Sequence, residues 1–231
     1  MILEELIHDL SQQSSFLLAI DGMSGSGKTT LAHHLAQKFH AQVFHMDDFF
    51  LPLEMRTPER LQQSGGNVHY ERFLETVLKP LSCQQDVDYQ PFDCQAMTLK
   101  KSEHKSYCPF CIVEGSYALH PSLQSYYTHA VVLKISADTQ KERLLKRNPE
   151  KIEMFINKWI PLENQYFQAF DLFGQYPVLD ATHIFYPETQ VVLPLLKTDL
   201  LTIMRAVHDE TLSFLNVEFK DESAACVVRC V

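Results

Sequence analysis

Short apolar runs, separated by longer mixed segments, dominate the hydrophobic pattern of this chain. Four of them predict buried strands, namely Phe16–Ile20, Ala41–Met46, Phe110–Val113 and Ala130–Ile135. A fifth run, Thr182–Tyr186, indicates a last strand. Turn-forming or charged residues follow each of the first four runs, so the chain reverses or enters a helix after each strand.

Between these runs the apolar residues recur with a helical period. The segment Lys28–Phe39 carries Leu31, Leu35 and Phe39 four residues apart, which places them on one helical face. Comparable patterns predict further helices at 1–10, 69–81, from 136 onward, 149–173 and 200–215. The helix at the start is amphipathic and has no basic leader, which is not typical of a secretory signal.

Two polar stretches interrupt the pattern. Leu51–Gly66 is rich in Pro, Gln and charged residues and predicts a mobile loop. Asp86–Met97 is strand-like with turns, and Thr98–Ser106, which contains three lysines, predicts a hairpin tip or a solvated face.

A glycine-rich loop joins the first strand to the helix that follows it. Asp21–Thr30 contains the pattern G-x-x-x-x-G-K-[ST], from Gly22 to Thr29. Glycines let consecutive backbone N–H groups converge on phosphate oxygens, and the helix adds the positive end of its dipole. An ordinary Gly/Ser turn is the alternative. The expected nucleotide-binding residues are Gly22, Ser24, Gly25, Ser26, Gly27, Lys28, Thr29 and Thr30.

Carboxylates stand at the ends of two predicted strands. In a parallel sheet ligands collect at the carboxyl ends of strands, so Asp47, Asp48 and Glu114 would lie at the same edge as the phosphate loop. Asp47 is the candidate acceptor of a hydroxyl proton, and Thr29, Glu114 and Asp47 are candidate Mg²⁺ ligands. The alternatives are turn-capping aspartates and a Glu that faces solvent.

Basic residues follow the fourth strand. Arg143 and Arg147 are four residues apart on one predicted helical face, where, with Lys28, they could neutralise charge on a transferred phosphate. A solvated basic face is the alternative.

Composition narrows the class of protein. The 231 residues are enough for one ample domain with appendages, and the net charge of −9 argues against a nucleic-acid-binding or membrane-surface protein. No apolar run reaches transmembrane length, so a cytoplasmic protein is expected. Cys108 and Cys111 have metal-like or redox-like spacing, and Cys226 and Cys230 could complete a four-thiolate set. Reduced, inert thiols are the simpler interpretation, with Cys111 buried in a strand.

In this order, the phosphate loop, the Asp47–Phe50 and Glu114–Tyr117 motifs and the two arginines resemble the phosphoribulokinase/uridine kinase family of P-loop kinases. The resemblance implies an α/β fold of the P-loop NTPase type, with a doubly wound parallel sheet, an acceptor-site hairpin and a helical lid. It also implies ATP and Mg²⁺ and a small hydroxyl acceptor such as a nucleoside. On this basis residues 1–185 form the kinase domain and 186–231 an extension of unknown role. The sequence leaves open whether the chain forms a homo-oligomer.

The same resemblance supplies candidate acceptor residues: Asp48, Phe49, His69, Phe92, Asp93 and Tyr117. Two motifs depart from the family. Phe92–Leu99 keeps Asp93 but lacks the family's Tyr, His and Arg, and His69 stands where the family has a ribose-holding Asp. The sequence therefore favours a kinase over any particular acceptor. A nucleotide-dependent ATPase switch and a binding module with a degenerate acceptor site remain open. The GTPase motif N-K-x-D is incomplete at Asn157–Ile160, which favours ATP.

Overall fold

The structure is a computed structural model that describes residues 2–182, 191–194, 215–220 and 225–230. The chain divides into two compact units, Met1–Ile184 and Phe185–Val231. The first contains every residue that the sequence singles out for a nucleotide site. In the second, β10 (Val191–Pro194), β11 (Leu215–Lys220) and β12 (Ala225–Cys230) form an antiparallel sheet in the order β10-β12-β11.

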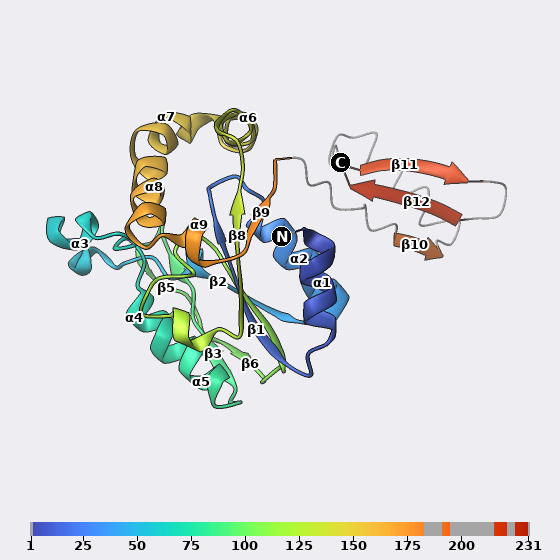
Figure 1. The fold of residues 1–231 in the computed structure, drawn as a ribbon, viewed down its shortest axis with the longest axis horizontal. Coiled ribbons are helices and arrows are strands. Elements are labelled where there is room, and N and C mark those ends of the chain that lie inside the picture. The colour runs from blue at the N-terminus through green and yellow to red at the C-terminus, as the bar shows by residue number, and fades with distance from the viewer. Residues whose placement is uncertain (1, 183–190, 195–214, 221–224, 231) are drawn as a thin grey trace. The chain divides into compact units, whose positions relative to one another are not determined.

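A five-stranded parallel sheet forms the centre of the first unit (Figure 1). Its strands are β1 (Phe16–Gly22), β2 (Gln42–His45), β7 (Phe110–Glu114), β8 (His129–Lys134) and β9 (Val178–Asp180), in the order β2-β7-β1-β8-β9. Every pairing in this sheet is parallel. The predicted α/β fold is therefore confirmed, and β1, which carries the phosphate loop, lies in the middle.

Burial on both faces explains why the central strands are continuous apolar runs. All seven residues of β1 are buried. Leu17 and Ala19 belong to a core cluster with Phe73 and Val77, while Leu18 between them is buried outside that cluster. Because successive strand residues point to opposite faces, each face needs its own helices.

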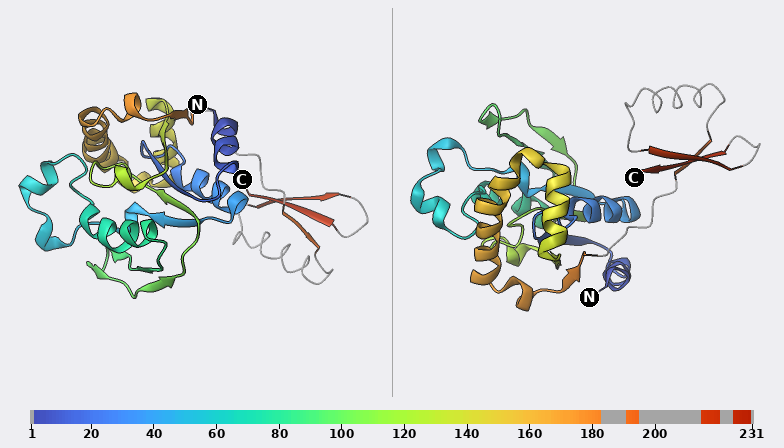
Figure 2. Two further views of the ribbon diagram at one scale, coloured as in Figure 1. Left: turned by 60° about the horizontal axis from the view of Figure 1, so that its bottom comes forward. Right: turned by 90° about the horizontal axis from the view of Figure 1, so that it is seen from above.

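Helices complete the first unit, as the two further views show (Figure 2). They are α1 (Leu3–Ser11), α2 (Lys28–Phe39), α6 (Ala137–Arg147), α7 (Ile152–Met154), α8 (Ile160–Ala169) and α9 (Leu172–Gln175). A continuous helical stretch consists of α4 (Tyr70–Phe73), a π-helical turn Leu74–Leu78 and α5 (Lys79–Ser82), and a second π-helical turn, Phe155–Trp159, joins α7 to α8. None of the helices in the described ranges is long and apolar enough to cross a membrane.

A hairpin follows β2 in the chain and precedes β7. Its tip is at residues 94–97, so the prediction of a tip at Thr98–Ser106 is wrong: that stretch forms the returning strands, and the alternative of a solvated face fits its mostly exposed residues. Here β3 (Val87–Tyr89) pairs with β6 (Glu103–Lys105), and β4 (Phe92–Asp93) pairs with β5 (Thr98–Leu99), all antiparallel. The segment predicted as a mobile loop contains two short helical pieces, Leu53–Met55 and α3 (Pro58–Gln62).

The side chain of Arg60 holds the segment Leu51–Gly66 in its folded conformation. Its guanidinium donates to the carbonyls of Gly66 (2.9 Å) and Val68 (3.0 Å) and to both carboxylate oxygens of Glu71 (2.6 and 2.9 Å). A side chain that bridges the ends of a loop in this way compensates for the absence of a local apolar pattern.

The last strand of the sheet differs from the prediction. It is β9 at Val178–Asp180, and Thr182, where the strand was expected to begin, lies just beyond it. The remainder of the predicted strand and nearly all of the predicted 200–215 helix lie outside the described residues; Leu215 begins β11. The interpretation of Cys111 holds, since it is buried in β7. Across the described part of the chain, no group of three or more His, Cys, Asp or Glu residues is arranged to hold a metal ion.

Acid pH is expected to destabilise the first unit through His120. This ring is 8% exposed and stacks on Tyr70 with centroids 3.8 Å apart; burial, aided by the Arg60 charge, lowers the pKa of His120 to about 4. The unfolded chain takes up this proton near pH 6.5 but the folded chain near 4, so stability falls by about 3 kcal/mol as pH decreases across that window. His120→Gln should remove this contribution to the pH dependence, so that urea unfolding curves recorded from pH 7 to 4 show a loss of stability about 3 kcal/mol smaller than in the unchanged chain. His8→Gln, at an exposed histidine, is the control and should keep the full pH dependence; an unchanged slope in His120→Gln would contradict the assignment.

Candidate active site

The phosphate loop connects β1 to α2 and takes its shape from glycine. Gly25 and Gly27 have φ values of 77° and 91°, in the left-handed region that favours glycine. A Cβ placed on Gly27 would meet nothing within 4 Å, so open space lies directly over the loop. The Ser26 hydroxyl is buried and has no hydrogen-bond partner. An open cradle with an unsatisfied donor beside a helix N-terminus fits a phosphate group.

Lys28 begins α2 and folds back over the loop. Its ammonium group donates to the carbonyl oxygens of Gly22 (2.8 Å) and Met23 (3.1 Å). These two bonds hold a positive charge at the loop. The loop thus combines the N-terminus of a helix with one cation, and both favour the binding of a polyphosphate.

A polar cluster lies beside the loop at the end of β7. The Thr29 hydroxyl donates to Glu114 Oε1 (3.2 Å), and His45 Nδ1 lies 2.6 Å from the same oxygen. The hydrogen bond to Glu114 raises the pKa of His45. One hydroxyl and one carboxylate fit Mg²⁺, which keeps most of its water ligands and needs few protein groups.

A cavity of about 240 Å³ opens between the phosphate loop, the end of β2 and the helices after β8. Its lining includes Ser24, Asp47, Asn67, Ser116, Tyr117, Arg147, Lys151, Phe155, Trp159 and Glu163. Asp47 is accessible to solvent at this cavity. Although the residue as a whole is exposed, the groups packed around its carboxyl partly desolvate it and raise its pKa; the charges of Glu114, Glu163 and Asp48 raise the pKa further, and Lys28 opposes the shift. The result is a carboxylate with increased basicity near a lysine ammonium.

Two buried carboxylates, neither of them predicted from the sequence, hold the loop in place. Asp21, which is fully buried, accepts hydrogen bonds from the amides of Gly22 (2.7 Å) and Leu119 (2.9 Å) and from the Tyr166 hydroxyl (2.8 Å). Burial raises the pKa of Asp21 to about 6. Glu163 on α8 accepts from the Ser24 amide at 3.0 Å.

Solved structures share this architecture. A possible uridine kinase from Bacillus stearothermophilus aligns with a TM-score of 0.61 and 20% identity, over 77% of this chain and 96% of that one. A candidate fructose transport system kinase from Silicibacter sp. TM1040 aligns with a TM-score of 0.61 and 22% identity, over 78% and 98%. The chain has a uridine kinase-like P-loop fold. A candidate P-loop kinase with a circular permutation from Saccharomyces cerevisiae also aligns, with a TM-score of 0.59, 13% identity and coverage of 79% and 99%.

Sequence comparison adds a separate, short match. A stretch of 42 residues, 18% of this chain, is 50% identical to a phosphoribosylamine–glycine ligase from Caldanaerobacter subterraneus subsp. tengcongensis. The corresponding match to the ligase of Fusobacterium nucleatum subsp. nucleatum is 43% identical over 42 residues. The chain spans 10% of the length of these curated relatives. No protein-family model matches the chain.

The two arginines that the sequence predicts on one helical face have different surroundings in the structure. Arg143 donates to the carbonyl oxygens of Gly25 (3.4 Å), in the loop, and of Ala181 (3.0 Å), just after β9. Arg147 is exposed and lines the cavity, with Lys151 a turn farther on. In Figure 1 the arrowhead of β8 points toward α6, the helix that carries both arginines. Arg147 is the better placed of the two for a phosphate at the cavity.

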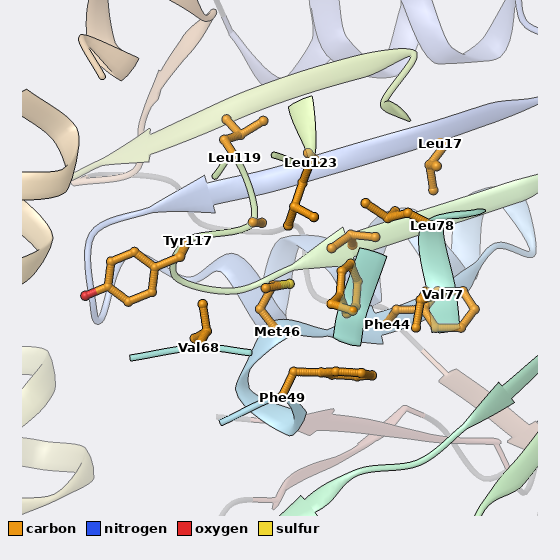
Figure 3. Close-up of a cluster of buried hydrophobic side chains, with 14 of the residues drawn as sticks. Leu17, Phe44, Met46, Phe49, Val68, Val77, Leu78, Tyr117, Leu119 and Leu123 are labelled. Carbon is orange, nitrogen blue, oxygen red and sulfur yellow. The ribbon is translucent and has the colours of Figure 1, made fainter. Parts of the chain in front are cut away.

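The candidate acceptor residues also divide. Tyr117 lines the cavity, and Figure 3 shows its hydroxyl directed away from the apolar cluster. Phe49 is completely buried in that cluster, edge-to-face on Phe73 at 4.8 Å, and has no surface for a ligand. Asp48 accepts a hydrogen bond from the Tyr89 hydroxyl at 2.6 Å, which ties the end of β2 to the hairpin.

The remaining three candidates do not line the cavity. His69 lies immediately before α4 and its amide donates to the Phe49 carbonyl at 2.6 Å. Phe92 is buried in β4. Asp93 accepts from the amides of Gln95 (2.8 Å) and Ala96 (3.0 Å), which stabilises the hairpin turn. The Asp93 carboxylate and the Phe92 ring therefore have structural roles in the hairpin, while the half-buried His69 is held at this place by its backbone.

Proposed function

We propose that this chain is an ATP-dependent kinase that phosphorylates a hydroxyl group of a small metabolite, a nucleoside in the first instance. One observation carries the proposal: Ser24 of the phosphate loop and Asp47 at the end of β2 line the same cavity. A phosphate held by the loop and a hydroxyl group next to Asp47 would therefore meet at that cavity, as phosphoryl transfer requires.

The chain's own residues divide the work. The loop amides and Lys28 hold the β- and γ-phosphates, while Arg147 neutralises charge that develops on the transferred group. Asp47 orients the acceptor hydroxyl and accepts its proton as the oxygen bonds to the γ-phosphorus and the bond to ADP breaks. Thr29 and Glu114 would hold Mg²⁺, which when bound neutralises phosphate charge.

The cavity also supports a polyhydroxylated acceptor with a flat apolar face. Tyr117, Phe155 and Trp159 supply aromatic surface, and Asn67 and Ser116 supply hydrogen-bonding groups. Aromatic walls with a few polar groups are typical of sites for nucleosides and sugars. The solved structures named above carry the names of a uridine kinase and a fructose transport system kinase, which are kinases of these two acceptor classes.

An acceptor panel tests the proposal. The full chain is incubated with ATP, Mg²⁺ and single nucleosides or sugars, and the products are separated by mass. A phosphorylated acceptor, formed with an equal amount of ADP, is the expected result. Hydrolysis of ATP at the same rate with and without acceptors would instead favour an ATPase switch. Nucleotide binding without turnover would favour a binding module.

A further inference from the structure

Glu163 has an unusual place for a carboxylate in a nucleotide site. It is 4% exposed and lies on α8, with both oxygens directed at the phosphate loop and its neighbour. Oε2 accepts from the Ser24 amide at 3.0 Å, while Oε1 accepts from the hydroxyls of Ser24 (2.5 Å) and Ser116 (2.9 Å). Three charge-assisted hydrogen bonds therefore join a helix far along the chain to the loop and to the end of β7.

This arrangement occupies Ser24 completely. Its amide and hydroxyl donate to Glu163, and its carbonyl accepts from Gln140 Nε2 at 3.0 Å. Ser24 is nevertheless the loop residue that lines the acceptor cavity. In this structure both donors of the loop residue at the cavity are therefore directed at a carboxylate.

The position of Glu163 is fixed by its own helix. One turn farther along α8, the Tyr166 hydroxyl donates to Asp21 at 2.8 Å, and Tyr166 is completely buried. Asp21 is the last residue but one of β1, so this bond attaches α8 to the central sheet. The Tyr166 bond therefore holds helix α8 in place independently of the Glu163 contact.

We propose, on the basis of the function above, that Glu163 is a positioning residue that withholds the Ser24 donors from the nucleotide and keeps the γ-phosphate at the cavity mouth, facing Asp47. A phosphate drawn onto the Ser24 amide would move away from the acceptor hydroxyl. The negative charge of Glu163 acts in the same direction, since it repels the terminal phosphate. The residue thus weakens ATP binding in exchange for a γ-phosphate that stays available for transfer.

Nucleotide affinities of the full chain test this role. Glu163→Gln keeps the shape of the side chain and removes its charge, so Mg·ATP should bind about tenfold more tightly than to the unchanged protein. Mg·ADP, which has no γ-phosphate, should bind within about twofold of the unchanged protein. Tyr166→Phe is the matched control: it removes a buried hydrogen bond from the same helix, so the thermal midpoint should fall while the ratio of the two affinities stays the same.

Titration calorimetry with each nucleotide, together with thermal unfolding of each variant, distinguishes the outcomes. Tighter binding of Mg·ATP but not of Mg·ADP to Glu163→Gln supports the positioning role. A lower kcat together with a lower KM for ATP, with any acceptor from the panel, also supports it. Weaker binding, or equal changes for ATP and ADP, would show that Glu163 only supports the loop structure and would overturn the inference. If the acceptor panel alone fails, the proposed kinase activity is contradicted. The ratio of the Mg·ATP and Mg·ADP affinities would still test the role of Glu163.

Discussion

Replacing Lys28 with methionine is expected to lower phosphoryl transfer by about 10³-fold. Methionine keeps most of the length of the side chain but removes the ammonium group that donates to the Gly22 and Met23 carbonyls. Without the ammonium group, no lysine charge stabilises the bound triphosphate or the negative charge that develops on the phosphate during transfer. Initial rates with the acceptor found in the panel measure the loss.

Lys38→Met provides the control for that variant. Lys38 lies on the same helix, α2, but is exposed in the last turn of that helix. The rate of phosphoryl transfer by Lys38→Met should therefore match that of the unchanged chain. A Lys28→Met protein that keeps its thermal midpoint and transfers phosphate at more than a tenth of the normal rate would show that the loop lysine is not part of the reaction.

The second large effect is expected at Asp47. Asp47→Asn should lower turnover by about 10²-fold or more and leave the affinity for Mg·ATP nearly intact. Asparagine retains a hydrogen-bond acceptor for the hydroxyl group but cannot take its proton. The surrounding carboxylates and desolvation raise the pKa of Asp47, which increases its ability to accept a proton, and the amide loses this property entirely.

The neighbouring residue gives the comparison for Asp47. Asp48→Asn weakens the hydrogen bond with Tyr89, so its main effect should be a lower thermal midpoint. Turnover by Asp47→Asn equal to that of the unchanged chain, measured with the true acceptor, would remove Asp47 from the mechanism. Equal losses of turnover in both variants would indicate that the effect comes from the shape of the β2 end.

The strands and the phosphate loop were predictable because their signals are local. Leu17–Ile20 is buried on both faces and therefore appears as an unbroken apolar run, and the geometry of Gly25 and Gly27 depends on the absence of side chains. The strand-end rule also placed Asp47 and Glu114 at the correct edge of the sheet. These features need no information from distant parts of the chain.

Long-range contacts account for what the sequence did not reveal. Arg143 and Arg147 share a helical face in the sequence pattern, but only the docking of α6 against the loop determines that Arg143 faces Gly25 and Arg147 the cavity. Phe49 follows two aspartates in a motif that resembles an acceptor site, yet packing against Phe73 buries it. Glu163 contacts Ser24 across 139 positions of sequence. The only local indication of the role of Glu163 was that it is a single carboxylate between apolar and aromatic residues of a helix.

The binding of Mg·ATP to the full chain tests the central claim most directly, because every proposed role depends on a triphosphate held by the loop between β1 and α2. Titration calorimetry, with circular dichroism to confirm that the protein is folded, is the appropriate measurement. The account predicts saturable binding of one nucleotide per chain, strongly weakened in Lys28→Met. A folded chain that shows no saturable binding of Mg·ATP, or that binds it equally well without the Lys28 ammonium group, would contradict it.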